Sequence, residues 1–332
     1  MANTIEWEYE EIGKLQRRPK LTVLMSVYNA DQYVRSAIES ILQQNHKDFE
    51  FIIFDDASTD SSRDIICSYA DIRIQRFFSK HNVGQAMLYN YGIHIARGDY
   101  IAIMDSDDIS LSNRFTRQIT YLEQNRDISI CGTWAKIFGI FGEIVWKQPV
   151  EFDDIRCFLL FDSPFIQPTI MMRRFDLIQY QLFYDEKNRY AEDYDFWAKC
   201  SIYLKMANIP EVLLKYRRSP GQITTAHRTE QLQAADTTRE RLLIRYFGAS
   251  EEEIAIHNRL FRPTDQWEVV EKVKEWLAIL VRYNHEQKIY DTKVFQKVIS
   301  LHWQRFCNRI IGQTKKYKNN LSKYTYKCTY KE

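Results

Sequence analysis

The sequence predicts an α/β protein with a parallel sheet that carries helices on both faces, followed by a region made of helices alone. Three observations support this prediction. Strand-like and helix-like segments alternate four times before residue 106, an order typical of parallel sheets with crossover helices. Polar residues follow three of these strands directly. Beyond residue 226, apolar residues recur at helical spacing, which predicts helices only.

Composition places the chain among ordinary globular proteins. It has 332 residues, 45% hydrophobic and 27% charged, and this length suggests about two domains. The net charge of +2 gives no general attraction to nucleic acid. No stretch reaches the roughly 20 apolar residues of a membrane span, and the N-terminal segment lacks a signal peptide's apolar core. We therefore expect a cytoplasmic protein.

The first half of the chain supplies the expected parallel sheet. Short apolar runs rich in β-forming residues predict strands at Leu21–Val27, Phe49–Phe54, Ile72–Phe78 and Tyr100–Met104. Helical spacing between them predicts three helices, at 33–42, from about 61 to 69 and at Gly84–Ala96.

The remainder of the chain is mixed at first and then helical. A helix is expected at Asn113–Asn125, strands at Ile128–Phe138 and Phe165–Met172, and a helix from near Glu192. Four further helices are expected at Glu230–Tyr246, Glu251–Leu260, Gln266–Tyr283 and Thr292–Ile311. The expected organisation is a polar extension at 1–20, an α/β domain at 21–225 and a helical region at 226–332.

The strongest chemical signal follows the fourth strand. Asp105, Asp107 and Asp108 place three carboxylates within four residues. Like charges this close raise each other's pKa unless a cation neutralises them, and oxygen ligands suit Mg²⁺ or Mn²⁺. The alternative is a capping cluster for the helix at Asn113. At the end of an apolar strand, however, the triplet predicts a metal site.

Two further acidic pairs occur at element boundaries. Asp55 and Asp56 follow the second strand, where they could accept hydrogen bonds from a base or ribose. Glu192 and Asp193 begin a helix, where one of them could act as a general base. Helix capping is the structural alternative for the first pair, and the helix macrodipole, which favours acids at a helix start, is the alternative for the second.

Cysteine and histidine spacing gives no sign of a further metal site. The six cysteines lie far apart, so we expect free thiols rather than disulfides or zinc ligands. The seven histidines show no H-x-x-x-H pattern, and we expect each at the surface or at a helix cap.

Four segments, taken in order, resemble the family 2 glycosyltransferases: VLMSVYN, FIIFDDASTD, HNVGQAMLYNYGIHIARGDYIAIMDSDD and AEDYDFW. The resemblance extends over roughly Leu21 to Thr225 and leaves out the helical region. It implies a GT-A fold at 21–225 and an enzyme that transfers a sugar, with inversion, from a nucleotide diphosphate donor.

The resemblance also implies roles for single residues. Asp193 would be the base that deprotonates the acceptor hydroxyl, and Asp107 would hold Mn²⁺ or Mg²⁺ at the diphosphate. Tyr28 would lie against the base, Asp56 would accept from its imide, and Asp105 would face the ribose. The full implied nucleotide pocket is Ser26, Tyr28, Asp55, Asp56 and Asp105. The supporting residues would be Asn82, Gly84, Asn90, Glu192, Arg217 and Arg218.

The resemblance is incomplete at two positions. Family members often carry histidine where this chain has Gln167 and Ser219. Serine is a poorer ligand than histidine for a metal or a diphosphate, so the resemblance does not fix the donor geometry or the metal dependence. Arg217 or Arg218 would pair with phosphate instead.

The predicted function is transfer of a hexosyl or N-acetylhexosaminyl group, with a UDP-sugar as the expected donor. The expected acceptor is a saccharide or lipid-linked saccharide, as in polysaccharide biosynthesis. One alternative is a non-catalytic nucleotide-binding relative of the same fold. The other is a sugar nucleotidyltransferase, which should have a glycine-rich loop after the first strand, where Ser26–Ala30 has no glycine.

The C-terminal segment Arg305–Glu332 carries eight basic side chains and one acidic one. A solvated tail is the simplest interpretation. The alternative is contact with an anionic membrane, to which each basic residue near the surface contributes about 1 kcal/mol. The protein would then act at the inner face of a membrane.

Overall fold

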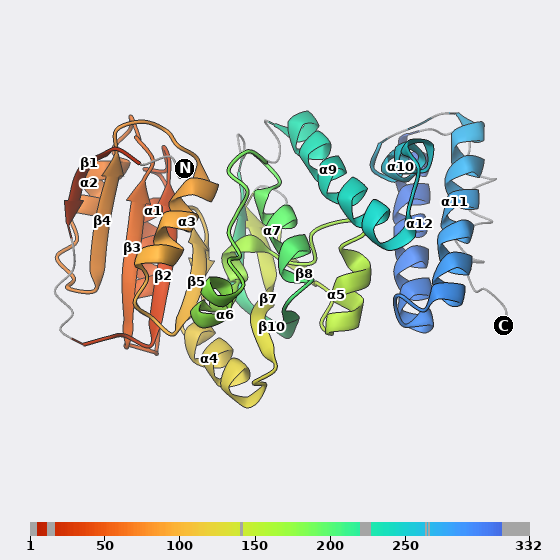
Figure 1. Ribbon diagram of the computed structural model, residues 1–332. Helices are drawn as coiled ribbons and strands as arrows, with labels where there is room; N and C mark the ends of the chain where they lie inside the picture. The colour runs from red at the N-terminus through yellow and green to blue at the C-terminus, as the bar shows by residue number, and fades with distance from the viewer. Residues whose placement is uncertain are drawn as a thin grey trace. The chain divides into compact units, whose positions relative to one another are not determined.

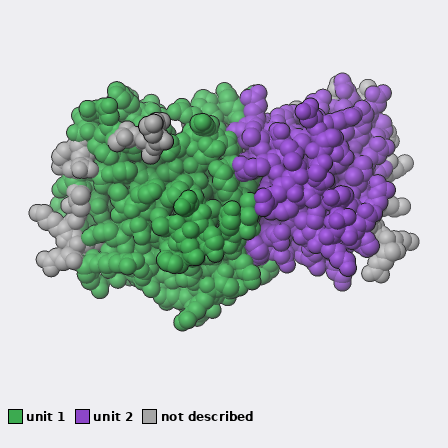
Figure 2. Space-filling model, in the orientation of Figure 1, with its two compact units in different colours: residues 1–151, 163–231 green, residues 152–162, 232–332 purple. Residues whose placement is uncertain are grey.

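The computed structural model describes residues 5–11, 17–139, 142–219, 227–262, 264 and 266–313 (Figure 1). The chain divides into two compact units (Figure 2). The first comprises residues 1–151 and 163–231, and the second comprises 152–162 and 232–332. The division at 1–20, 21–225 and 226–332 stays a prediction about functional domains, which compactness alone does not define.

The first unit is built on one mixed sheet. Within the described ranges its strand order is β1-β4-β3-β2-β5-β9-β7-β10-β6, with β8 paired to β7. Four neighbouring strands are parallel: β2 at Leu21–Val27, β3 at Phe49–Asp55, β4 at Ile74–Ser79 and β5 at Tyr100–Asp105. All residues of β3 and β4 are buried, as expected for strands covered on both faces. The four predicted strands are confirmed.

Helices connect these strands at the predicted places. They are α1 at Val34–Leu42, α2 at Ser62–Cys67 and α3 at Gln85–Ile95. In α1 the buried apolar residues include Val34, Ala37, Ile38 and Ile41, a spacing that places them on one helix face. The strand–helix alternation therefore reflects burial of one face of each connecting helix.

One edge of the sheet carries a strand that the sequence pattern did not reveal. β1, at Trp7–Glu11, pairs antiparallel with β4. The Trp7 ring lies 5.9 Å from the Phe54 ring, 5.2 Å from that of Phe77 and 5.1 Å from that of Tyr91. This aromatic anchor lies in a segment whose many charges had suggested only a polar extension.

The other half of the sheet is less regular. Its strands are β6 at Ile109–Ser110, β7 at Ile128–Gly139, β8 at Ile144–Trp146, β9 at Met171–Arg173 and β10 at Lys205–Arg218. β9 is antiparallel to both β5 and β7, whereas β10 is parallel to β7. The parallel arrangement predicted for the first 105 residues is confirmed, and the antiparallel pairs belong to the part of the chain whose pattern is mixed. β10 was not predicted, and its register shifts between Ile209 and Val212, where Pro210 offers no N–H to the ladder.

The strand predicted at Phe165–Met172 is mostly absent. A 3₁₀ turn, η1, occupies Gln167–Thr169, and only β9 follows as a strand. Pro168 cannot donate a ladder hydrogen bond, and Thr169 Oγ1 donates to the Ile166 carbonyl at 2.7 Å. These two local features turn the chain before β9 begins.

Helices fill the rest of the two units. The first unit adds α4 at Arg114–Gln124, α6 at Arg174–Gln179 and α7 at Glu192–Cys200. The second contains α5 at Phe152–Phe158, most of α9 at Arg228–Phe247, α10 at Glu251–Asn258, η2 at Arg259–Phe261, α11 at Trp267–Gln287 and α12 at Thr292–Gln313. The predicted C-terminal helices are thus confirmed.

A buried carboxylate, that of Glu50, links the parallel strands near their amino ends. Glu50 is inaccessible to solvent and accepts hydrogen bonds from Thr22 Oγ1, Gln75 Nε2, Arg97 N and Arg97 Nε, each at 2.7 Å. Because four donors satisfy its two oxygens, the charge is tolerated in the interior. Glu50 thereby joins β2, β3, β4 and the segment after α3.

Two histidines lie in the core of the second unit, which corrects the expectation that all seven lie at surfaces or caps. His257 Nε2 lies 2.9 Å from the Leu160 carbonyl, and Trp276 Nε1 donates to His257 Nδ1 at 3.1 Å. A carbonyl only accepts and an indole N–H only donates, so His257 is neutral with its proton on Nε2. Burial, together with the charge of Arg239, lowers the pKa of His257 to about 3.

His302 is the second buried histidine. Its ring stacks on Phe161 at 4.3 Å, and its Nε2 has no hydrogen-bond partner. Burial, followed by the charge of Arg305, lowers the pKa of His302 well below the ordinary value. Both histidines are therefore uncharged in the folded protein.

None of the helices in the described part of the chain has the length and apolar character needed to cross a membrane. Cys67, Cys131, Cys157 and Cys200 are free thiols. The predicted membrane contact concerns Arg305–Glu332, of which residues 314–332 lie outside the described residues.

Acidification should destabilise the second unit through the two buried histidines. Their folded pKa values lie below the unfolded value of 6.5, so the unfolded state binds more protons as pH falls. The stabilisation is complete above pH 6.5 and is lost progressively below it. Between pH 7.5 and pH 5.0 we expect a loss of about 2 kcal/mol in unfolding free energy for each histidine, measured by urea denaturation.

The matched variant is His302→Phe, which keeps a ring against Phe161 and removes one titrating group. Its acid sensitivity should be smaller than that of the wild type by about one histidine's share. Equal sensitivity of the two proteins would contradict the assignment.

Candidate functional site

The parallel strands bring the predicted site residues together at their carboxyl ends. Ser26, near the end of β2, lies opposite Asp105 on one side. The next residue, Val27, lies opposite Asp55 on the other side. Residues from three separate segments are thus neighbours at the carboxyl ends of the strands, where ligands bind in α/β sheets.

The loops after β2 and β3 are tied together by hydrogen bonds. The Asn29 N–H donates to Ser58 Oγ at 3.0 Å, and Asn29 Oδ1 accepts from the Thr59 N–H at 2.8 Å. Asn29 and Ala57 both adopt positive φ, at 48° and 61°. Beside them Tyr28 is 52% exposed, so its ring is accessible to a planar ligand.

Asp56 organises the loop before α3. It is buried, and its two carboxylate oxygens accept the N–H of Val83 at 2.8 Å and of Gly84 at 2.9 Å. Asn82 Nδ2 lies 3.3 Å from the Asp56 carbonyl. Burial raises the pKa of Asp56, whereas the two backbone hydrogen bonds oppose the rise. Two of the predicted supporting residues thus contact Asp56, Gly84 at its carboxylate and Asn82 at its backbone carbonyl.

Asp55 is also buried, and its partners are fewer. Burial raises its pKa, and hydrogen bonds from Ser58 act in the opposite direction. Its Oδ1 atom has no hydrogen-bond partner. An unsatisfied buried acceptor is costly, so Asp55 retains capacity for a ligand donor.

The structure brings the acidic loop after β5 close to the start of α7. Burial, and then the charges of Asp107 and Asp193, raise the pKa of Asp105 to about 7. Gln85 Nε2, 3.5 Å from Asp105 Oδ1, is the donor directed at it. Asp105 therefore lies within electrostatic range of the predicted metal ligand, Asp107, and of the predicted base, Asp193.

Asp108 is the most deeply placed acid of the loop. It is inaccessible to solvent, and its Oδ1 accepts the Arg217 N–H at 2.7 Å. Its Oδ2 has no partner, and burial together with Asp107 and Asp105 raises its pKa well above the ordinary value. Capping does not explain this cluster, because α4 begins only after Asn113.

The two arginines at the end of β10 differ in their surroundings. Arg217 Nε donates to the Asp107 carbonyl at 2.7 Å, so its side chain lies against the acidic loop. Arg218, one residue further, is exposed. Pairing of either residue with phosphate stays a prediction.

α7 presents three acids in its first turn, Glu192, Asp193 and Asp195, where the helix macrodipole favours negative charge. Asp195 pairs with Lys199 at 2.7 Å. Burial raises the pKa of Glu192, and its Oε2 has no partner. Asp193 is half-buried, and its Oδ1 accepts the Tyr194 N–H at 2.7 Å.

Asn90 connects α3 to the segment that precedes α7. Its Nδ2 donates to the Tyr184 carbonyl at 3.0 Å, and its Oδ1 accepts the Tyr184 N–H at 2.8 Å. Gln167, in place of the family histidine, donates from Nε2 to Tyr184 Oη at 3.0 Å. Ser219 is half-buried just after β10.

Sequence reasoning missed two side chains of this region, Gln85 and Tyr184. Gln85 directly follows Gly84, so its place at the start of a helix beside the acidic loop was a usable signal. Tyr184 lies in a loop without periodicity, and only the fold brings it to Asn90 and Gln167.

The described residues contain no group of three or more His, Cys, Asp or Glu side chains arranged to hold a metal. Mg²⁺ and Mn²⁺ commonly take one or two carboxylates and complete their shell with substrate phosphate and water. The repulsion between Asp105 and its two acidic neighbours, Asp107 and Asp193, and the unpartnered Asp108 Oδ2 fit such a cation. The donor set therefore suits a divalent ion shared with a substrate.

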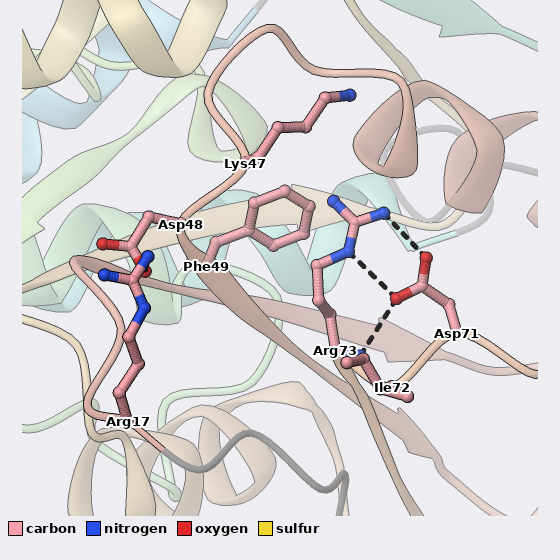
Figure 3. A pocket seen from close by; sticks show the side chains of 7 residues that line it. All are labelled: Arg17, Lys47, Asp48, Phe49, Asp71, Ile72 and Arg73. Carbon is pink, nitrogen blue, oxygen red and sulfur yellow. Dashed lines mark hydrogen bonds and ion pairs between the residues drawn. The ribbon is translucent and has the colours of Figure 1, made fainter.

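A separate pocket of about 520 Å³ lies at the amino ends of β3 and β4 (Figure 3). Four of its charged side chains form ion pairs, Arg73 with Asp71 at 2.7 Å and Arg17 with Asp48 at 3.2 Å, and Lys47 Nζ donates to the Leu42 carbonyl at 3.4 Å. Because it lies at the opposite ends of these strands from Asp55, it is not part of the candidate site.

Comparison with known proteins identifies the class. Residues 22–181 match the model of the family described as glycosyl transferase family 2. An uncharacterized glycosyltransferase of Haemophilus influenzae is 33% identical over 233 residues, which cover 67% of this chain and 72% of that protein. The chain therefore belongs to glycosyltransferase family 2 and is a glycosyltransferase.

Solved structures agree on the fold. TarS 1-349 from S. aureus, in complex with UDP-GlcNAc, gives a TM-score of 0.57 at 14% identity and covers 93% of this chain and 89% of its own. The mannosyltransferase PcManGT from Pyrobaculum calidifontis, in complex with GDP-Man and Mn²⁺, gives 0.56 at 14% identity, with coverage of 93% and 91%. The GT-A fold predicted from the sequence is confirmed.

Replacing Ala57 by glycine should stabilise the protein. Its φ of 61° costs a residue with a Cβ atom about 1–2 kcal/mol, and glycine avoids this cost but gains freedom in the unfolded chain. We expect Ala57→Gly to add about 0.5–1 kcal/mol to the unfolding free energy, seen as a higher melting temperature. Ala57→Val should do the opposite, and a destabilised Ala57→Gly protein would refute the explanation.

Proposed function

We propose that this glycosyltransferase transfers a sugar from a nucleotide diphosphate donor, a UDP-sugar, to a hydroxyl of a saccharide or lipid-linked saccharide, with inversion. One observation carries the proposal. The carboxylates of Asp107 and Asp193, from segments far apart in the sequence, both act electrostatically on Asp105 at the carboxyl end of β5. A metal ligand and a base within one site are what such a transfer needs.

The nucleotide half of the site is assigned to the loops after β2 and β3. The exposed Tyr28 ring would lie against the base. Asp56 would accept from the base imide through the lone pairs that Val83 and Gly84 leave unused. Ser26 and Asp105 lie opposite each other in the sheet, which supports their place beside the ribose.

Asp107 is the residue proposed to hold a divalent ion, Mn²⁺ or Mg²⁺. When bound, such an ion neutralises charge on the departing diphosphate without any proton transfer. The GDP-Man and Mn²⁺ complex of PcManGT supports a divalent ion here.

Asp193 is the proposed general base. Its carboxylate accepts the proton of the acceptor hydroxyl while that oxygen bonds to the anomeric carbon and the bond from that carbon to the diphosphate breaks. Inversion requires the base and the leaving group on opposite faces of the sugar, the single-displacement logic of inverting glycosidases. Asp193 is proposed rather than Glu192 from the family resemblance, and the action of its charge on Asp105 supports the choice.

The identity of the transferred sugar is proposed only as a hexosyl or N-acetylhexosaminyl group, in line with the UDP-GlcNAc complex of TarS. A role in polysaccharide biosynthesis, in the cytoplasm and at the inner face of a membrane, is proposed from the basic segment Arg305–Glu332.

Nucleotide binding should depend on metal and on Asp107. In a thermal-shift series with UDP, TDP, GDP and CDP, each with and without Mn²⁺, we expect the largest shift with UDP and Mn²⁺. A ligand at 100 times its dissociation constant stabilises by about 2.7 kcal/mol, and Asp107→Ala should lose the metal-dependent part. No shift with any nucleotide would overturn the proposed donor site.

Removing the base should separate catalysis from binding. Asp193→Asn should lower sugar transfer from a UDP-sugar by about 10²–10⁴-fold, because the amide cannot accept the proton. The thermal shift with UDP and Mn²⁺ should remain. Asp127→Asn, which changes an exposed acid paired with Lys205 at 3.2 Å, is the matched control and should leave transfer unchanged. Full activity of Asp193→Asn would exclude Asp193 as the base.

A further inference from the structure

The end of β10 is placed against the acidic loop by strand pairing. β6, which follows this loop, pairs antiparallel with β10, with Ser110 opposite Leu214 and Ile109 opposite Lys215. Continuing the same register places Arg217 opposite Asp107. The sheet itself therefore brings an arginine to the backbone of the proposed metal ligand.

Arg217 contacts the loop with both its backbone and its side chain. Its N–H donates to Asp108 Oδ1, and its Nε donates to the Asp107 carbonyl, each at 2.7 Å. A hydrogen bond from a charged guanidinium is stronger than a neutral one. Two consecutive residues of the loop are thus fixed by one residue of β10.

Two aromatic rings hold the guanidinium in place. Its central carbon lies 4.5 Å from the ring centre of Tyr33, just before α1, and 4.5 Å from that of Phe138, in β7. Contacts of this kind are favourable cation–π interactions. They restrict the planar group, so the position of Nε, and with it the Asp107 carbonyl, is set by three separate elements.

We propose that Arg217 is a positioning residue, which fixes the Asp107 backbone so that the carboxylate of Asp107 is preorganised for the divalent ion. This inference rests on the proposed function, because it concerns the same metal ligand. It differs from the sequence-based expectation, in which Arg217 or Arg218 would itself pair with phosphate. Outer partners of metal ligands commonly change metal affinity by 10–100-fold.

The test compares Arg217→Lys with the wild type in two assays. Lysine keeps the charge but lacks the planar fork and its stacking. We expect the Mn²⁺ concentration for half-maximal UDP binding, followed by thermal shift, to rise about tenfold. UDP binding in EDTA should be unchanged, and the KM for the UDP-sugar at saturating Mn²⁺ should return close to the wild-type value.

A direct phosphate contact would give the opposite pattern. Arg217→Lys would then weaken UDP binding in EDTA while leaving uridine binding intact, and the raised KM would persist at saturating Mn²⁺. That result would overturn the proposal. An unchanged Mn²⁺ requirement in Arg217→Lys would also overturn it.

Two further variants guard against a general loss of structure. Phe138→Leu keeps Arg217 and removes one of its rings, and it should raise the Mn²⁺ requirement in the same direction by a smaller factor. Arg117→Lys changes an exposed arginine of α4 that pairs with Glu211, and its Mn²⁺ requirement should equal that of the wild type.

Different results would contradict the proposed function and the positioning role of Arg217. If the wild type shows no metal-dependent UDP binding, the proposed function fails. If the wild type shows it and Arg217→Lys leaves the Mn²⁺ requirement unchanged, only the positioning role fails.

Discussion

Buried negative charge at the carboxyl ends of the parallel strands is the constraint around which the site is built. Asp55, Asp56 and Asp108 are each at most 3% exposed, and an unpaired charge in such a position costs several kcal/mol. Donors must therefore be brought to these acids. The N–H groups of Val83 and Gly84 come to Asp56, and the N–H of Arg217 comes to Asp108. The loops around the site are shaped by this demand.

Buried acids at the two ends of the parallel strands differ in how fully their oxygens are hydrogen-bonded. At the amino end, Glu50 is fully satisfied by donors from its own chain, and it serves the fold. At the carboxyl end, Asp55 Oδ1 and Asp108 Oδ2 have no partner, and burial, followed by the charges of Asp107 and Asp193, raises the pKa of Asp105. The protein leaves an excess of acceptors there. Such a surplus suits a site that is completed by cations and by donors from a substrate.

Local patterns predicted the parts of the fold that local chemistry determines. Apolar runs such as Leu21–Val27 gave the parallel strands, and the acids after them gave the candidate site. What escaped depended on partners distant in the sequence. β1 is held by the contact of Trp7 with residues more than forty positions away, and β10 is interrupted by Pro210. His257 is buried because Leu160 and Trp276 satisfy its nitrogens, and the approach of Asp193 to Asp105 required the folded sheet.

The composition of the second unit, which includes residues 152–162, has a consequence for the order in which the chain folds during synthesis. Leu160 and Phe161 emerge from the ribosome long before His257, Trp276 and His302. At about 5–20 residues per second, roughly seven to thirty seconds separate Phe161 from His302. Until Arg239 and His257 emerge, this apolar segment lacks the partners that its Phe161 and Leu160 carbonyls have in the folded unit. A nascent chain stalled within α9 would therefore be a natural substrate for chaperones that bind exposed apolar segments.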